Sequence, residues 1–239
     1  MTIAGNTSSP APGSLLDRCD VAVIGGGVVG CAVARRLTLE GADVVLLEKA
    51  PDILDGASKA NSAILHTAFD APPGSLEHAL MLRGREEYLA IRDSLNLPVL
   101  ETGALVVAWT EEEAALLEGI LRRAHDNGIT DTRLMSAREA RAVEPGLADA
   151  LVAAVHVPGE YLVDPWSAPL AYLLQAIANG ARAWTNAAVT GGERDADGWL
   201  LHTPRGDVRA GHVVNCAGLY GDVLDRELLG ESDFSIHPR

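Results

Sequence analysis

The chain has 239 residues and is 48% hydrophobic, enough for one large domain or two small ones with a substantial core. Its formal net charge of −14 argues against a nucleic-acid backbone or an anionic membrane surface as the main partner. The cysteines (Cys19, Cys31 and Cys216) are few, odd in number and without metal-binding spacing, which favours a reducing compartment and a cytoplasmic location.

The N-terminal residues 1–16 are small, nearly uncharged and rich in Pro, Gly and Ser, so we expect a disordered tail. They lack the basic start and the apolar stretch of a signal peptide. No apolar run approaches the roughly 18 residues that a membrane helix needs, so we expect no transmembrane segment.

Residues 20–48 predict a strand, a glycine turn, a helix and a second strand that ends in an acid. Gly25 permits the tight turn, Gly27 lets the backbone approach a pyrophosphate, and Gly30 lets the helix pack close to the strand. The helix N-terminus presents free N–H groups and a partial positive charge to phosphates. At the end of the second strand, Glu48 can accept hydrogen bonds from both ribose hydroxyls. The order of strand, glycine turn, helix, second strand and acid predicts dinucleotide binding rather than a glycine turn in an ordinary βαβ unit.

The middle of the chain alternates helical and extended patterns after a long loop, 51–70. Long loops rich in small polar residues are often functional. Hydrophobic periodicity and helix start and stop signals predict the elements that follow. We expect helices over 75–95, 110–127, 136–144 and 165–179, and extended segments over 99–109 and 151–157.

The last part of the chain predicts a small antiparallel meander and then a buried strand. Turn signals separate short strands over 187–192, 199–203 and 207–209. Residues 212–218 are an apolar strand that runs into a glycine turn.

These elements predict an α/β fold in which a Rossmann-like parallel sheet with an antiparallel meander is interrupted by a second domain. We expect 17–80 and 164–239 to form a discontinuous nucleotide-binding domain. Residues 81–163 are expected to form an inserted α+β cap domain.

Four segments of the chain are informative together: VAVIGGGVVG with Glu48, GASKANSAILH at 56–66, EARAVEP at 139–145 and VVNCAGLYGD at 213–222. In this combination the chain resembles the FAD-dependent oxidoreductases of the D-amino-acid-oxidase superfamily, above all the branch of glycerol-3-phosphate dehydrogenase and L-2-hydroxyglutarate oxidase. The resemblance implies an FAD-binding fold of the glutathione-reductase type and FAD as the cofactor. It also implies oxidation of a CH–OH or CH–NH bond, with hydride passing to the flavin N5.

The resemblance further implies which residues meet the cofactor. The glycine turn is expected to bind the pyrophosphate, and the acid is expected to bind the adenosine ribose. The rest of the cofactor is expected to contact the Ser-x-x-Asn-Ser stretch and the turn after the last strand. The expected cofactor-binding residues are Gly25, Gly27, Gly30, Glu48, Lys49, Ser58, Asn61, Ser62, Val189, Ala217, Gly218 and Asp222.

His66 matches a histidine that the family places near the flavin ring, and it is the expected catalytic residue. A neutral imidazole can accept the substrate hydroxyl proton as hydride leaves. The alternative is a structural histidine that binds loop backbone. The family's stretch often continues as His-x-Gly, whereas here Thr67 and Ala68 follow. No histidine spacing suits a metal, and we expect none.

We therefore expect an FAD-dependent dehydrogenase or oxidase that acts on a small anionic or polyol substrate of the glycerol 3-phosphate or 2-hydroxy acid type. Its electron acceptor (oxygen, quinone or a carrier) is open. Family members run well past this length, so we expect a fragment or truncated product that needs a C-terminal segment or a partner chain. The alternatives are an amine or amino-acid oxidase of the same superfamily, a non-catalytic FAD-binding fragment and an NAD-dependent Rossmann dehydrogenase. The loop after Glu48 and the late VVNCAG strand count against the last.

Overall fold

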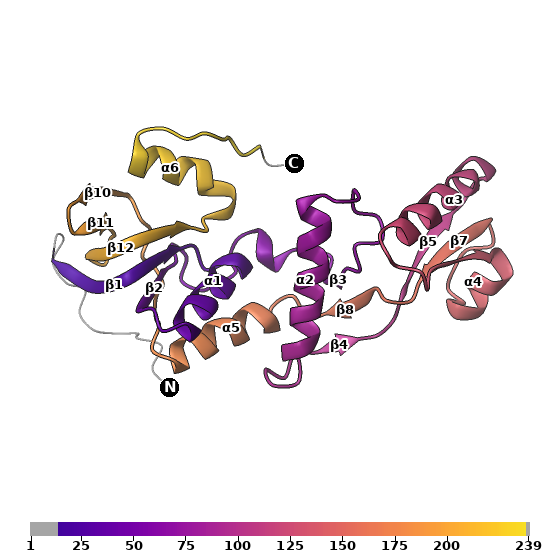
Figure 1. Cartoon of the computed structure of the whole chain (residues 1–239), viewed down its shortest axis with the longest axis horizontal. Coiled ribbons are helices and arrows are strands. Elements are labelled where there is room, and N and C mark those ends of the chain that lie inside the picture. The colour runs from indigo at the N-terminus through magenta and orange to yellow at the C-terminus, as the bar shows by residue number, and fades with distance from the viewer. Residues whose placement is uncertain (1–13, 238–239) are drawn as a thin grey trace. The chain divides into compact units, whose positions relative to one another are not determined.

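The computed structural model describes residues 14–237, so most of the predicted tail lies outside the described residues. The chain divides into two compact units (Figure 1). The first unit combines the chain up to Asn61 with the chain from Pro165 onward, and the second unit is Ser62–Asp164. The insertion was predicted, but its start differs from the expected residue 81, because the strand at residues 64–65 pairs within the second unit.

The first unit is built on a six-stranded sheet in the order β10-β11-β12-β1-β2-β9. Strands β12, β1, β2 and β9 are parallel, and β10, β11 and β12 form an antiparallel meander, which confirms the predicted fold class. The strands are β1 (Leu15–Ile24), β2 (Val44–Leu47), β9 (Arg182–Trp184), β10 (Gly191–Asp195), β11 (Gly198–His202) and β12 (Asp207–Asn215). The helices are α1 (Val28–Leu39), α5 (Ser167–Ala178) and α6 (Gly221–Leu229), with 3-10 turns η1 (Ala57–Lys59) and η2 (Gly218–Tyr220).

Both faces of this sheet are buried, as the continuous apolar runs of β1 and β2 require. On β1, Val21 and Val23 pack into a cluster that includes buried residues of α1 and α5. The alternate residues Ala22 and Ile24 pack against the meander and α6. Because successive side chains of a strand point to opposite faces of the sheet, one apolar segment contributes to the hydrophobic core on each face.

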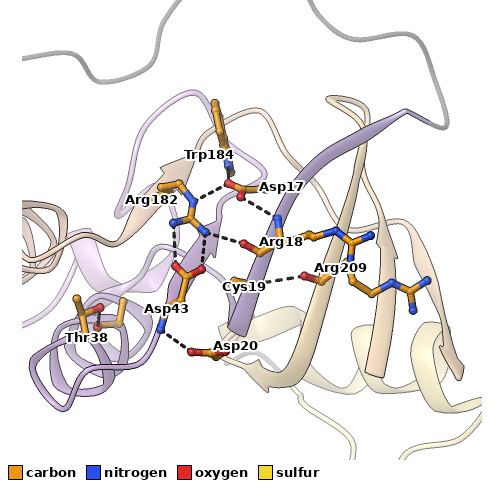
Figure 2. A network of polar contacts seen from close by, with 10 residues as sticks. Asp17, Arg18, Cys19, Asp20, Thr38, Asp43, Arg182, Trp184 and Arg209 are labelled. Carbon is orange, nitrogen blue, oxygen red and sulfur yellow. Dashed lines mark hydrogen bonds and ion pairs between the residues drawn. The ribbon is translucent and has the colours of Figure 1, made fainter. Parts of the chain in front are cut away.

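An ion-pair network ties together the starts of the parallel strands, at the end of the sheet away from the glycine turn (Figure 2). The guanidinium of Arg182 donates to Asp17 and Asp43, in each case at 2.8 Å, and to the carbonyl oxygen of Arg18 at 2.7 Å. Trp184 Nε1 donates to the same Asp17 carboxylate at 3.0 Å. The planar guanidinium has enough donors to serve all three acceptors. The network therefore ties the start of β9 to the starts of its neighbour β2 and of the next strand, β1.

The second unit contains two three-stranded sheets, in the orders β3-β8-β4 and β5-β7-β6, and three helices. All the strand pairs are antiparallel. The strands are β3 (Ile64–Leu65), β4 (Val99–Leu100), β5 (Ala104–Ala108), β6 (Arg133–Ser136), β7 (Ala153–Val157) and β8 (Tyr161–Val163). The helices are α2 (Leu76–Ile91), α3 (Glu111–Asp126) and α4 (Ala137–Val143).

The β5-β7-β6 sheet is covered by a helix on each face. Val155 and Val157 of β7 pack with buried residues of α3, whereas Ala154 packs with Ala140 of α4. A capping box starts α4: Ser136 and Glu139 exchange side-chain-to-backbone hydrogen bonds, as their spacing predicts.

Several boundaries differ from the sequence-based expectation. Strand β1 begins at Leu15, inside the segment that we expected to be a tail, because it continues pairing with β12. Strand β12 is continuous where we expected two strands, and β9 was not expected at all. No helix among residues 14–237 is long and apolar enough to cross a membrane.

Candidate cofactor site

The glycine turn after β1 accepts no side chain at two of its positions. Gly25 has φ +112°, and a Cβ there would lie 2.3 Å from the carbonyl oxygen of Cys216. A Cβ on Gly30 would lie 1.8 Å from the carbonyl oxygen of Gly25. The strand, the turn and α1 therefore pack at a distance that only glycine permits. Gly27 is less crowded, with Ser58 Oγ at 3.0 Å from such a Cβ.

The N-terminus of α1 is open to an anion. Its N-cap is Gly27, which has no side chain to cap the helix. The N–H of Val28 donates to Ser58 Oγ at 3.0 Å. Because that hydroxyl accepts from the helix, its own hydrogen remains available to donate to an anion. The helix dipole and the free N–H groups of the first turn favour a phosphate here.

Glu48 closes the other side of the turn and is only 7% exposed. Its Oε2 accepts the N–H of Gly26 at 2.6 Å, and its Oε1 accepts the N–H of Ala50 at 2.8 Å. Each carboxylate oxygen has a second lone pair, so the group can still accept hydrogen bonds from two ligand hydroxyls. Charge-assisted bonds to backbone N–H groups hold a buried carboxylate in one orientation.

These groups line one cavity of about 570 Å³ at the carboxyl ends of the parallel strands. Ligands of open α/β sheets bind at this edge, and the volume is typical of small-molecule sites. Of the predicted residues, those that line the cavity are Gly25, Gly27, Glu48, Lys49, Ser58, Val189, Ala217 and Gly218.

The cavity also contains residues that the sequence analysis did not single out. The Lys49 ammonium lies 3.3 Å from the centroid of the Tyr220 ring, a cation–π contact. A hydrogen bond from Lys59, helped by the charge of Lys49, lowers the pKa of the Asp55 carboxyl. The aromatic residue was visible in the segment AGLYGD, but nothing local indicated that its ring would lie beside the lysine.

Four of the predicted cofactor residues do not line this cavity: Gly30, which packs against the backbone of the turn, and Asn61, Ser62 and Asp222. Asp222 is buried in the first turn of α6 and pairs with Arg226 at 2.9 Å, and this hydrogen bond lowers its pKa. The amide of Asn61 donates to the carbonyl oxygen of Ser58 at 2.8 Å. Ser62 belongs to the second unit. The i,i+4 spacing of Asp222 and Arg226 on one helix brings these two side chains together.

His66 lies in the second unit, directly after β3. Its Nδ1 is 2.9 Å from Oε2 of Glu160, whose side chain is only 3% exposed. Nothing in the sequence had marked Glu160. Two residues further on, Ala68 is buried and has φ +67°, a conformation that favours glycine. Ala68 stands where the family's His-x-Gly pattern has glycine, and the backbone at this position is still in the left-handed conformation.

Comparison with known proteins identifies what this arrangement resembles. Residues 20–239 match the model of the family described as "FAD dependent oxidoreductase", DAO. The glycerol 3-phosphate dehydrogenase of Caloramator mitchellensis is 30% identical over 92% of this chain and 46% of its own length. The L-2-hydroxyglutarate dehydrogenase of Indibacter alkaliphilus is 31% identical over 91% of this chain and 55% of its own length.

Among solved structures, the L-alpha-glycerophosphate oxidase of Mycoplasma pneumoniae with FAD bound has a TM-score of 0.81 at 29% identity. The match covers 89% of this chain and 57% of the oxidase. The chain thus spans about half the length of the curated relatives that it matches.

Proposed function

The chain belongs to the family of FAD-dependent oxidoreductases, and on that premise we propose that it binds FAD and takes part in oxidising a CH–OH bond of a small anionic or polyol substrate. One observation carries the proposal: the crowded glycine turn and the buried carboxylate of Glu48 meet at a single cavity. A dinucleotide needs both features, one for its diphosphate and one for its ribose.

The residues present fit this cofactor. The space that a Cβ on Gly25 or Gly30 would occupy is filled by backbone, so the turn keeps the close geometry that a diphosphate needs. The N-terminus of α1 and the hydroxyl of Ser58 supply donors for phosphate oxygens. Glu48 supplies acceptors for ribose hydroxyls, and the Tyr220 ring offers a flat apolar surface at the cavity.

The chemistry divides between the cofactor and the chain. When bound, FAD supplies at its flavin N5 the acceptor for the hydride that leaves the substrate carbon. The chain binds and orients the cofactor through the glycine turn, Ser58 and Glu48. His66 takes up the substrate hydroxyl proton at Nε2, because the unprotonated nitrogen of a neutral imidazole can accept a proton.

The named relatives support the proposed substrate class. Glycerol 3-phosphate and L-2-hydroxyglutarate both carry a secondary hydroxyl and an anionic group, and the dehydrogenases named for them are 30% and 31% identical to this chain. We propose a substrate with the same two features. Oxygen, a quinone or a carrier protein is the electron acceptor. The cytoplasmic location remains a proposal that rests on the small number of cysteines in the sequence.

The first test is the absorption spectrum of the purified chain after FAD has been added and the excess removed. We expect flavin bands at about one FAD per chain. A chain that stays colourless, while its circular dichroism shows a folded protein, contradicts the proposed cofactor.

The second test is anaerobic reduction of the bound flavin. Glycerol 3-phosphate or L-2-hydroxyglutarate is expected to bleach the flavin bands. Bleaching by glycine or sarcosine alone favours the amine-oxidase alternative. Flavin that binds but is bleached by none of these compounds favours the non-catalytic FAD-binding alternative.

A further inference from the structure

The register of a short strand pair places an acid opposite His66. Strands β3 and β8 are antiparallel, with Leu65 opposite Tyr161. The next positions outward are His66 and Glu160, which extend the same register. Directly opposed residues of an antiparallel pair have Cβ atoms about 4.5–5.5 Å apart. The backbone alone therefore brings these two side chains together.

The carboxylate of Glu160 is fixed from its other side. Its Oε1 accepts the N–H of Thr67 at 2.5 Å and the hydroxyl of Thr67 at 2.7 Å. The turn before Glu160 packs tightly on the same threonine, since a Cβ on Gly159 would lie 2.8 Å from Thr67 Cγ2. A buried carboxylate is costly unless it is paired and hydrogen-bonded. These two donors hold Oε1 and leave Oε2 facing the ring of His66.

The contact between the ring and Oε2 determines which nitrogen carries the hydrogen. Nδ1 of His66 lies 2.9 Å from Oε2 of Glu160. Nδ1 is buried and has no hydrogen bond of standard geometry to any group among residues 14–237. An Nδ1 without a hydrogen would place its partial negative charge 2.9 Å from an anionic oxygen, whereas Nδ1–H places a partial positive charge there, so the carboxylate favours the hydrogen on Nδ1. In the neutral ring the lone pair is then on Nε2.

The opposite edge of the ring is accessible. The side chain of His66 is 39% exposed although its Nδ1 is buried, so the exposed atoms lie on the rest of the side chain. Arg85 of α2 steadies this strand end: it donates to the carbonyl oxygen of Leu65 at 2.9 Å and stacks over the ring of Tyr161 at 4.4 Å. Within the part of the chain that the structure describes, these contacts place two charged groups at this strand end, Glu160 from the β7–β8 turn and Arg85 from α2.

We propose that Glu160 is a positioning residue for His66, which fixes the Nδ1–H tautomer and leaves Nε2 as the atom that accepts the substrate hydroxyl proton. The tautomer assignment stands on the geometry of the second unit. The consequence for catalysis rests on the proposed function. After proton uptake the imidazolium has a carboxylate partner in place, as in other histidine bases oriented by an acid.

The variant Glu160→Gln tests the idea because Thr67 constrains how the new amide can sit. The N–H of Thr67 can only donate, so it keeps the amide oxygen of the glutamine. The NH₂ group must then face Nδ1, which becomes an acceptor, and the hydrogen moves to Nε2. We therefore expect this substitution to invert the tautomer rather than merely to weaken the preference for it.

The measurement is ¹⁵N NMR of the histidine rings in the full chain, with FAD added and at a pH where His66 is neutral. The resonance of His66 is assigned by comparison with His66→Gln. We expect Nδ1–H in the unmodified chain and Nε2–H in Glu160→Gln. Glu101→Gln removes an exposed acid of the same unit and should leave the tautomer unchanged. Glu160→Asp retains the carboxylate and should retain Nδ1–H.

An Nε2–H tautomer in the unmodified chain overturns the proposal, even if Glu160→Gln fails to fold. An unchanged tautomer in a folded Glu160→Gln chain also overturns it. The rate of flavin reduction provides a separate test, with an expected loss of about 10²–10⁴-fold in Glu160→Gln and little loss in Glu160→Asp. Inversion of the tautomer in a chain that binds no flavin supports the positioning role while contradicting the proposed function.

Discussion

A methyl group added at Gly30 is expected to break the cofactor site while keeping the chemistry of every polar group. In Gly30→Ala the new Cβ would lie 1.8 Å from the carbonyl oxygen of Gly25, closer by 1.2 Å than the 3.0 Å limit of real Cβ contacts. Backbone is on both sides of this contact, so no side chain can move to relieve it. Helix α1 must shift away from β1 by roughly 1 Å.

The cost follows from what the shift disturbs. Cys31 and Ala34 of α1 are fully buried against the sheet, and moving them opens gaps in a close-packed core. Overpacking of this kind costs about 1–3 kcal/mol, partly offset by about 1 kcal/mol from the higher helix propensity of Ala. We expect a net loss of about 1 kcal/mol, and at most about 2 kcal/mol, in the free energy of unfolding. The N-terminus of α1 moves with the helix, and FAD affinity should fall by about 100-fold or more.

The assay combines urea unfolding with an FAD titration followed by flavin fluorescence. Gly119→Ala is the matched control, because Gly119 lies in helix α3 and an added Cβ meets no atom within 4 Å. It should raise the stability of the second unit by about 1 kcal/mol and leave FAD binding unchanged. A Gly30→Ala chain that unfolds at the original urea concentration and binds FAD within about 3-fold of the original affinity would refute the reasoning.

Four further outcomes are expected. Glu48→Gln keeps the shape of the side chain but loses the charge that accepts two backbone N–H groups, so FAD affinity, measured by the same titration, should fall by about 10–100-fold. Arg182→Met removes a partly exposed ion-pair network that lies at the end of the sheet away from the glycine turn. Urea unfolding should show a loss of about 1–2 kcal/mol in the free energy of unfolding, with FAD binding unchanged. A change in FAD affinity would contradict a purely structural role for this network. Burial raises the pKa of the Cys19 and Cys31 thiols to about 12. At about pH 8, both should react with a thiol reagent about 100-fold more slowly in the folded chain than in urea. Equal rates would count against their burial. Burial lowers the pKa of His156 below 6.5, so near this pH the folded chain binds fewer protons than the unfolded chain. Stability should therefore fall as the pH drops below about 6.5. In His156→Gln the urea midpoint of unfolding should fall less steeply between about pH 7 and pH 5.

Local patterns sufficed where an element is specified by its own residues. The helix expected after the glycine turn is α1, Val28–Leu39, and the strand expected next is β2, Val44–Leu47. Both are long or apolar enough for periodicity to identify them. The capping box at Ser136 was also visible, because its two residues are three positions apart and interact within one turn.

Elements defined by their neighbours were not predictable in this way. Strand β9, Arg182–Trp184, is short and partly polar, and it exists because it pairs with β2 and is held by the network around Arg182. Strand β12 was expected as two segments, 207–209 and 212–218, yet its pairing with β1 includes both Ala210 and His212. Such strands depend on tertiary context more than on propensity.

The sequence by itself determined the glycine turn and the acid that we propose to bind the dinucleotide. Gly25, Gly30 and Glu48 lie within one βαβ unit, where strand, turn and helix geometry fix their relative positions without reference to the rest of the chain. Only the tertiary structure decided that Glu160 faces His66 and that Tyr220 lies beside Lys49. These residues are far apart along the chain, and strand register and packing bring them together, which no local pattern encodes.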